Sequence, residues 1–221
     1  MKVRVCYSLA SFIILLLSKG GLWRIGSLGK AKHRMLMSLE KNVEFFAGED
    51  VSQRVMESSE EISEKTDKIK VAMWVKGAME RLDSMEEEKK RVQIMENCGF
   101  SCFEVNRRVF EKALSRRKKF GNIDEFLEAE QRSPMVGTRL LRKGNNLHQF
   151  YTPKSFKKPM RCYCALLRGL PENQTVSETY CHCARGFVKK FWEGILEKPV
   201  RVELKRSAVR GSEECEFVIY T

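Results

Sequence analysis

Cysteine is the residue whose number and spacing in this sequence could support chemistry. The chain has eight cysteines, and six of them form three close pairs. The pairs are one Cys-x3-Cys (Cys98 and Cys102) and two Cys-x-Cys (Cys162 with Cys164, and Cys181 with Cys183). Two cysteines so close in sequence rarely bridge each other, because the small ring would be strained. Each pair is therefore better suited to presenting two sulfur atoms to an external partner.

A transition-metal ion is the simplest such partner. Zinc binds four thiolates in a tetrahedron, and iron–sulfur clusters use the same type of ligand. The sequence therefore predicts a zinc site, or alternatively an iron–sulfur cluster. The candidate ligands are Cys98, Cys102, Cys162, Cys164, Cys181 and Cys183, or four of these.

Geometry and neighbouring residues limit this prediction. On a regular helix, Cys181 and Cys183 would point in directions that differ by about 200°, given 3.6 residues per turn. Both can serve one metal only if the helix begins irregularly or after Cys183. His182 is the one histidine near a cysteine pair, while His33 and His148 are expected in loops or on the surface.

Three other interpretations of the cysteines stay open: redox-active or nucleophilic thiols, structural disulfides in an exported protein, and buried core residues. Cys102 is the candidate catalytic residue. Ser101 and Glu104 form a capping-box pattern that would place Cys102 in the first turn of a helix, where the helix dipole favours a thiolate. Cys215, in an alternating final strand, is expected in the core.

Helices dominate the first half of the sequence. In residues 67–85 the apolar side chains recur at steps of three and four, which is the pattern of an amphipathic helix. Asp50 is expected to cap an earlier helix, and Gly99 to interrupt the helical run at a turn that contains Cys98. A short helix is expected to follow an Asn122 cap.

Strands and one long helix make up the second half. The expected elements are a hairpin about Asn145 and Asn146, a strand at 160–167, a long helix between Ser177 and Pro199, and a final hairpin about Gly211 and Ser212. The sequence therefore predicts an α+β fold. N-terminal helices precede a small antiparallel sheet, which packs with one long helix and ends in a C-terminal β-hairpin.

The first 37 residues differ in composition from the rest of the chain. They carry seven of the twelve net positive charges and no acidic residue, and residues 5–18 are mostly apolar. This apolar stretch is shorter than a membrane span, which needs roughly 20 residues. Three interpretations stay open: translation that begins at Met35 or Met37, an uncleaved membrane anchor, and a secretion signal.

The predicted organisation is an N-terminal segment, 1–37, followed by a single α+β domain, 38–221. That domain is expected to be mainly helical over 38–96, and cysteine-rich and ligand-binding over 97–221. We expect a cytoplasmic protein, with a membrane anchor at 5–18 as the alternative.

The remaining positive charge indicates solvated basic faces. It lies mainly in residues 106–120 and 152–161, and no RNA-binding motif or recognition-helix pattern accompanies it. We therefore expect no nucleic-acid partner. Membrane contact is expected only if residues 1–37 are translated and retained. A homodimer through the helical region near 66–95 is a further expectation.

The C-terminal part of the chain resembles a known family. Residues 183–221 are similar to the end of the 4-vinyl reductase-like domain family, in which a helix leads into a strand and a hairpin with the pattern Arg-Gly-x-x-x-Cys-x-Phe. This chain has that pattern at Arg210, Gly211, Cys215 and Phe217. The resemblance extends to L-2-amino-thiazoline-4-carboxylic acid hydrolase-like proteins. It implies a cytoplasmic α+β domain that binds small molecules, is cysteine-rich, and in some members binds metal.

The cysteine pairs and the resemblance together predict a function. We expect a cysteine-rich protein that binds a transition metal beside a pocket for a small organic ligand. The alternative is a hydrolase of small heterocyclic or amide substrates that uses a cysteine nucleophile or a metal-bound water. Whether the protein is an enzyme stays open at this stage.

Overall fold

A computed structural model describes residues 33–135, 137–153 and 161–221 of the chain. Its α-helices are α1 (Arg34–Ala47), α2 (Glu49–Val55), α3 (Lys68–Met85), α4 (Glu88–Val105), α5 (Arg107–Arg117), α6 (Ile123–Arg132) and α7 (Cys181–Leu196). Its strands are β1 (Thr138–Lys143), β2 (Asn146–Tyr151), β3 (Arg201–Arg206) and β4 (Cys215–Tyr220). Short 3-10 helices are η1 (Ser59–Glu61), η3 (Ala165–Leu167), η4 (Glu178–Tyr180) and η5 (Ala208–Arg210). The predicted α+β fold is confirmed.

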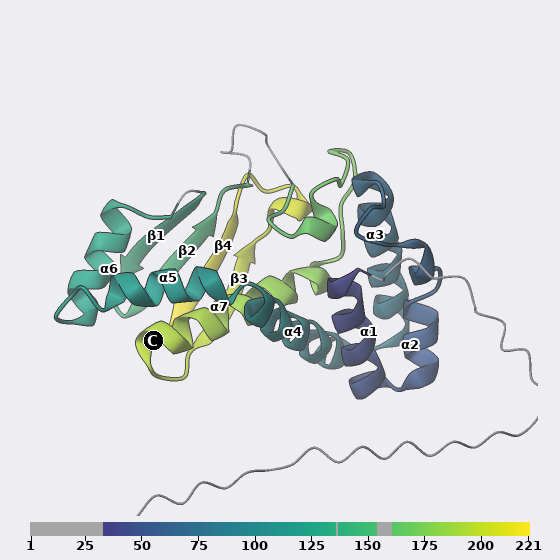
Figure 1. Cartoon of the computed structure of the whole chain (residues 1–221), viewed down its shortest axis with the longest axis horizontal. Helices are drawn as coiled ribbons and strands as arrows, with labels where there is room; N and C mark the ends of the chain where they lie inside the picture. The colour runs from purple at the N-terminus through teal and green to yellow at the C-terminus, as the bar shows by residue number, and fades with distance from the viewer. Residues whose placement is uncertain (1–32, 136, 154–160) are drawn as a thin grey trace, which may run out of the picture.

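The elements form two packed groups, which lie at opposite ends of the molecule in Figure 1. One hydrophobic core lies among α1 to α4 and the segment that contains η3 and η4. The second core lies between the sheet and α5, α6 and α7. Helices α4 and α7 pack against each other where the two groups meet. The region of this contact holds most of the cysteines.

The predicted amphipathic helix at 67–85 is confirmed as α3. The Asp67 carboxylate caps it by accepting hydrogen bonds from the backbone N–H groups of Ile69 (2.9 Å) and Lys70 (3.2 Å). Its buried face includes Val75 and Leu82. The expected Asp50 cap is wrong, because α2 begins at Glu49 with Gly48 as its cap, so Asp50 lies within the first turn.

The predicted helix interruption at Gly99 is also wrong. Helix α4 continues through Gly99 to Val105, so Cys98 lies inside a helix and not in a turn. The next helix, α5, begins at Arg107, and Ser101 caps neither helix. Glycine is present because another helix passes too close for a side chain: a Cβ atom at Gly99 would lie 2.1 Å from the carbonyl oxygen of Cys183 in α7.

The sheet is antiparallel, with the strand order β1-β2-β4-β3. The predicted first hairpin is confirmed, with its turn one residue earlier than expected, because Lys143 pairs with Asn146. Gly144 provides the positive φ of 59° that this tight turn requires. The C-terminal hairpin of β3 and β4 is confirmed as well, with Gly211 at a φ of 102°.

The strand expected at 160–167 is wrong. Within its described part, residues 165–167 form η3, and the backbone N–H of Leu167 bonds locally to the carbonyl of Cys164 at 3.1 Å. The central strands of the sheet already have partners on both sides, because β2 lies between β1 and β4, and β4 lies between β2 and β3. The segment therefore packs on α3 instead, where Gly169 allows close contact with the backbone of Lys68.

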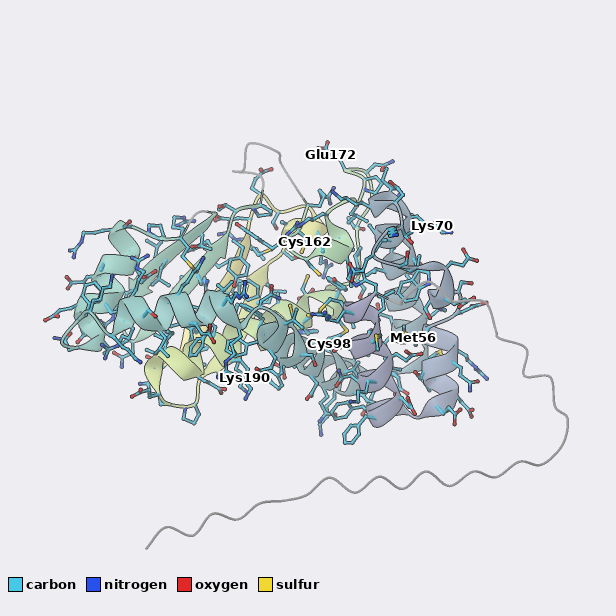
Figure 2. The ribbon with its side chains drawn as sticks, in the orientation of Figure 1. Met56, Lys70, Cys98, Cys162, Glu172 and Lys190 are labelled. Atoms are coloured by element: carbon cyan, nitrogen blue, oxygen red, sulfur yellow. The ribbon has the colours of Figure 1, made fainter. Side chains whose placement is uncertain are left out.

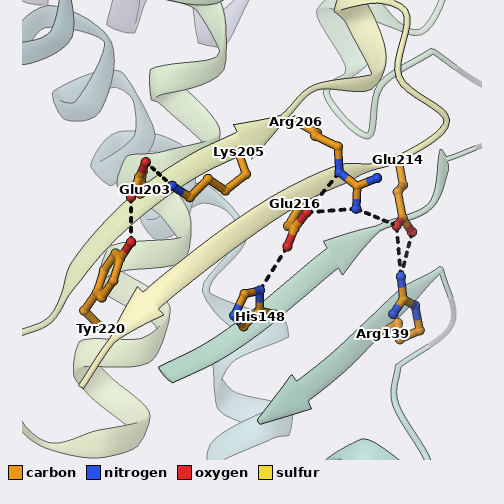
Figure 3. Close-up of polar contacts among 8 residues, drawn as sticks. All are labelled: Arg139, His148, Glu203, Lys205, Arg206, Glu214, Glu216 and Tyr220. Atoms are coloured by element: carbon orange, nitrogen blue, oxygen red, sulfur yellow. Dashed lines mark hydrogen bonds and ion pairs between the residues drawn. The ribbon is translucent and has the colours of Figure 1, made fainter. Parts of the chain in front are cut away.

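One face of the sheet carries a network of charged side chains (Figure 3). Glu216 of β4 contacts His148 of β2 at 2.9 Å and Arg206 of β3 at 2.8 Å. Arg206 also contacts Glu214, which contacts Arg139 of β1 at 2.9 Å. The network therefore links all four strands through their side chains.

Within the described residues, none of the helices has the length and the apolar character needed to cross a membrane. Both Cys6 and the apolar stretch 5–18 lie outside the described residues. The predicted division at residue 37 stays a prediction, although helix α1 already begins at Arg34.

Candidate thiol site

The seven described cysteines are all free thiols, and four of them lie on α4 and α7, the two helices that pack against each other. We call these seven residues the thiol cluster: Cys98, Cys102, Cys162, Cys164, Cys181, Cys183 and Cys215. Figure 2 labels two of them, Cys98 and Cys162. Their electrostatic effects on one another's pKa values connect all seven thiols.

The crossing of α4 and α7 brings together Cys102 and Cys183. A Cβ atom at Gly186 of α7 would lie 2.3 Å from the carbonyl oxygen of Glu96 in α4, which matches the close contact at Gly99. Beside this crossing, the Glu96 carboxylate accepts a hydrogen bond from Arg185 at 2.8 Å. Glycine on both helices lets the backbones approach. As a result, the thiol of Cys183 is in hydrogen-bonding contact with the thiol of Cys102.

Cys102 has a lowered pKa. The largest cause is the hydrogen bond from the Cys183 thiol, which outweighs the opposing effect of burial. The side-chain amide of Asn106 also donates to the Cys102 sulfur at 3.4 Å. The helix dipole is not the cause, because Cys102 lies near the C-terminal end of α4, where a thiolate is disfavoured. Cys102 therefore stays a candidate reactive thiol. The helix-dipole effect predicted as the reason for its reactivity is wrong.

The other thiols are harder to ionise. Burial is the main cause that raises the pKa of Cys98 and of Cys181 to about 12 in each case. Cys98 accepts a hydrogen bond from Asn42 at 3.6 Å, and Cys181 lies 3.0 Å from the hydroxyl of Ser207. Both are buried and behave as core residues.

Cys164 and Tyr180 form a buried thiol–phenol pair. The Tyr180 hydroxyl donates a hydrogen bond to the Cys164 sulfur at 2.9 Å. This bond favours the Cys164 thiolate, yet burial is the larger effect and the pKa of Cys164 is raised. Cys215, predicted in the core, is half-buried and accepts a hydrogen bond from the backbone N–H of Ala208 at 3.3 Å.

Part of the cluster is partly exposed. Cys162, Cys164 and Tyr151 are half-buried. In each of them burial is nevertheless the largest cause that raises the pKa. Cys102 and Cys183 are half-buried as well.

The predicted metal site is not formed. Among the described residues, no three side chains of His, Cys, Asp or Glu are arranged to hold a metal ion. The expected divergence on a helix explains part of this result. Cys181 and Cys183 are both helical, so Cys181 faces Ser207 in one direction while Cys183 faces Cys102 in the other.

The histidines occupy positions that differ from the expected loops and surfaces. His33 is 9% exposed and caps α1 by accepting the N–H of Met35 at 3.2 Å. His148 lies on β2, against Glu216. His182, in the first turn of α7, has a buried Nδ1 atom without a hydrogen-bond partner. Burial, followed by the charges of Arg185 and Arg91, lowers the pKa of His182 to about 4.

Two hollows elsewhere on the described residues do not involve the thiols. One, of about 20 Å³, lies between α6 and the sheet beside Glu130 and Trp192. It has room for about one water molecule. The other opens beside α1, at Met37 and Ser101. Neither is lined by a cysteine or a histidine.

With this geometry in place, comparison with known sequences defines the class of the protein. The chain belongs to a family of unknown function, DUF6144, whose model matches residues 30–221. No curated protein matches the sequence.

Comparison with solved structures gives distant likenesses. An H-NOX domain from Shewanella oneidensis in the Fe(II)CO ligation state is 13% identical, with a TM-score of 0.42, over 85% of this chain and 97% of that one. An unliganded Fe(II) H-NOX protein from K. algicida is 11% identical, with a TM-score of 0.42, over 84% and 94% of the two chains. At such scores, what these proteins bind is not transferred to this chain.

These findings correct several sequence-based predictions. The resemblance to the 4-vinyl reductase-like and thiazoline hydrolase-like families is wrong, because the family whose model matches residues 30–221 is a different one. The predicted zinc or iron–sulfur cofactor is wrong too, since the described thiols do not converge on a metal position. The hydrolase alternative is wrong as well, because the family resemblance that suggested it is not the family whose model matches.

Proposed function

We propose that Cys102 and Cys183 form a redox site, in which a small-molecule oxidant converts the two thiols to a disulfide that other thiols later reduce. The observation that supports this most directly is the contact of the two thiols from two different helices. Glycine at 99 and 186 maintains that contact, because any side chain at either position would push the helices apart. The pair is therefore a consequence of how the fold is built.

The two thiols differ in the way that such chemistry requires. The lowered pKa of Cys102 makes it the nucleophile, because the thiolate and not the thiol attacks. The pKa of Cys183 is raised, with its hydrogen bond to Cys102 as the largest cause. Cys183 therefore keeps its proton in the resting state and stabilises the neighbouring thiolate.

The reaction balances with either of two classes of oxidant. The Cys102 thiolate attacks one oxygen of a hydroperoxide, the O–O bond breaks, an alcohol leaves and Cys102 becomes a sulfenic acid. With an organic disulfide it forms a mixed disulfide, and one thiol leaves. Cys183 then loses its proton, its sulfur attacks that of Cys102, and water or the second thiol leaves. Two electrons pass from the protein to the oxidant in both cases.

A reducing compartment suits this function. Free thiols persist in the cytoplasm, where small thiols and thioredoxin-like proteins keep them reduced. We therefore retain the expected cytoplasmic location as part of the proposal. The partner is a small organic molecule or peroxide that reaches the half-buried thiol of Cys102.

The test is to map the disulfides that form in the full-length, reduced protein. The protein is treated with tert-butyl hydroperoxide or 2-hydroxyethyl disulfide, and its peptides are identified by mass spectrometry. We expect one main disulfide, between Cys102 and Cys183, that is reversed by dithiothreitol. Cys102→Ser and Cys183→Ser should abolish it, while Cys98→Ser, a change at a buried thiol, should not. Oxidation that joins other cysteines and spares this pair would contradict the proposal.

A further inference from the structure

Ser207, which lies between β3 and η5, has a buried hydroxyl that two thiols share. Its oxygen lies 3.0 Å from the sulfur of Cys181, the first residue of α7. The same hydroxyl is in hydrogen-bonding contact with the sulfur of Cys215, the first residue of β4. The backbone N–H of the next residue, Ala208, donates to the Cys215 sulfur at 3.3 Å. The two sulfur atoms are therefore no further apart than two hydrogen-bond lengths.

The hydrogen bonds at Ser207 have a preferred direction. A hydroxyl has one proton to donate and two lone pairs that accept. Cys215 is half-buried and already accepts the N–H of Ala208, whereas Cys181 is buried and has no backbone donor of this kind among the described contacts. Negative charge is therefore better placed on Cys215. In the favoured arrangement the Cys181 thiol donates to the Ser207 oxygen, and the Ser207 hydroxyl donates to Cys215.

Cys98 shows how this arrangement differs from that of an ordinary buried thiol. The sulfur of Cys98 contacts the side-chain amide of Asn42 at 3.6 Å and the backbone carbonyl oxygen of Ser38 at 3.9 Å. Neither of these groups contacts a second sulfur in the described structure. Cys181 is equally buried, but a hydroxyl beside it leads directly to another thiol. A thiol that attacks within the protein needs only this second sulfur and no exposure to solvent.

We propose that Cys215 and Cys181 form a second oxidisable thiol pair, separate from Cys102 and Cys183, in which Ser207 relays a proton. The oxidant is a hydroperoxide. The Cys215 thiolate attacks one of its oxygens, the O–O bond breaks, and the alkoxide takes a proton from water and leaves as an alcohol. Cys215 is then a sulfenic acid.

The second step forms the disulfide. The Cys181 sulfur attacks the Cys215 sulfur, and the S–O bond breaks. Ser207 accepts the Cys181 proton while it gives its own proton to the leaving hydroxide, which departs as water. The sum is two thiols and one hydroperoxide giving one disulfide, one alcohol and one water. Because Ser207 ends with the same number of protons as it had at the start, it acts as a relay.

This second pair would join the two packed groups of the fold. Cys181 belongs to the core among α1 to α4, while Cys215 packs against the core between the sheet and its helices. It should also react after the first pair. Burial raises the pKa of Cys215, whereas the pKa of Cys102 is lowered, so a smaller fraction of Cys215 is the reactive thiolate. The disulfide between the groups is therefore a response to a larger dose of oxidant.

The test is to follow both disulfides in the full-length, reduced protein at rising doses of tert-butyl hydroperoxide, by mass spectrometry of peptides. We expect the Cys181–Cys215 disulfide at higher doses than the Cys102–Cys183 disulfide. Ser207→Ala should slow formation of the Cys181–Cys215 disulfide by at least about tenfold, within the range that positioned proton donors and acceptors supply. It should change the rate of the other disulfide by less than about twofold, which also shows that the variant is folded.

Two further variants separate the hydroxyl from its surroundings. Ser207→Thr keeps a hydroxyl and should restore most of the rate. Ser52→Ala is the matched control, because Ser52 is as buried as Ser207, at 5% exposed, and its hydroxyl donates to the carbonyl oxygen of Glu40 at 3.3 Å. Ser52→Ala should leave the rates of both disulfides close to those of the wild type.

Each other outcome has a definite meaning. Oxidation of Cys215 to a sulfinic acid, or to a disulfide with a cysteine other than Cys181, would overturn the second pair. Equal rates in the wild type and Ser207→Ala would overturn the relay, and equal losses of both disulfides would show that Ser207 only supports the structure. A Cys181–Cys215 disulfide in a protein that never joins Cys102 to Cys183 would contradict the proposed function and support this inference.

Discussion

Gly99 of α4 lies directly against the backbone of Cys183 in α7, so closely that a Cβ atom on Gly99 would stand 2.1 Å from the Cys183 carbonyl oxygen. The same Cβ atom would lie 2.8 Å from the backbone nitrogen of Phe187. Real Cβ atoms do not approach backbone atoms this closely. The distance between the two helices, and with it the contact of the Cys102 and Cys183 thiols, therefore depends on the absence of a side chain at residue 99.

Gly99→Ala should consequently weaken both the fold and the thiol pair. Backbone atoms cannot move aside as a flexible side chain can, so α4 and α7 must separate. Overpacking of this kind costs about 1–3 kcal/mol of the free energy of unfolding, and the upper end is expected here. Urea unfolding measures the loss. The rate of Cys102–Cys183 disulfide formation should fall in the fraction of protein that stays folded.

Gly77→Ala is the matched control for that substitution. Gly77 also lies inside a helix, α3, but a Cβ atom there would meet only the end of the Arg81 side chain, at 3.2 Å. That side chain can move, and alanine is favoured over glycine in a helix by roughly 0.5–1 kcal/mol. The control should be neutral or slightly stabilising. Similar losses for both variants would show that the close helix crossing has no special cost.

Asn106→Ala should make Cys102 less reactive. The Asn106 side-chain amide donates to the Cys102 sulfur at 3.4 Å and to the Cys102 carbonyl oxygen at 2.8 Å. Removing a donor to the thiolate raises the thiol pKa, so the pH midpoint for alkylation by iodoacetamide should move upward. At a fixed pH near neutrality, labelling of Cys102 should slow several-fold. Peptide mass spectrometry resolves this residue from the other cysteines.

Asn97→Ala controls for the loss of an amide in the same helix. Asn97 donates to the carbonyl oxygen of Gln93 at 2.9 Å, the same four-residue spacing, without a thiol. Asn97→Ala should affect helix stability about as much as Asn106→Ala does. It should not change the pH midpoint for alkylation of Cys102. An equal shift in both variants would mean that the amide acts on Cys102 only through the helix.

The sequence predicts local structure well where one pattern decides it. The apolar steps of α3, the Asn122 cap of α6 and the glycine of the second hairpin are local signals, and each of these elements forms where expected. The first hairpin forms too, with its turn one residue earlier than its asparagine pair indicated. Gly99 shows where such signals fail. A glycine inside a helical pattern predicts an interruption of the helix. Gly99 is instead required because α7, a helix far away in the sequence, packs too closely for a side chain at this position.

The candidate site could be predicted in part. Cys102 and Cys183 were both identified as chemically relevant from their close cysteine pairs, yet each contacts a cysteine of another pair instead of its own neighbour. Spacing within a pair cannot show which pairs meet in space. Asn106 was missed, because an asparagine after a helix is a common residue without a local signal of function.

His182 should make the protein less stable in mild acid. Its folded pKa of about 4 lies below the ordinary value of 6.5, with burial as the first cause. The unfolded chain therefore binds this proton first, and stability is lost as the pH falls from about 6.5 toward 4. His182→Asn should remove this part of the pH dependence. Urea midpoints at pH 7.5 and pH 5 measure it, and parallel pH profiles for the two proteins would contradict the assignment.

Glu216→Gln should destabilise the sheet at neutral pH. Burial alone would raise the pKa of Glu216, but hydrogen bonds from His148 and Arg206 lower it overall (Figure 3). Its side chain is only 14% exposed, so its contacts with Arg206 at 2.8 Å and with His148 at 2.9 Å matter more than surface ion pairs do. We expect a loss of about 1 kcal/mol.

The pH dependence of that loss gives the check. A carboxylate whose pKa is lowered by folding stabilises the protein above the unfolded value of 4.5, and this contribution disappears as the pH falls through the folded value. The difference between wild type and Glu216→Gln, measured by urea unfolding, should therefore vanish in acid. Glu203→Gln, at a side chain that is 38% exposed, should show a smaller difference at neutral pH. A larger effect at Glu203, or a Glu216 effect that persists in acid, would show that the network does not act through the Glu216 charge.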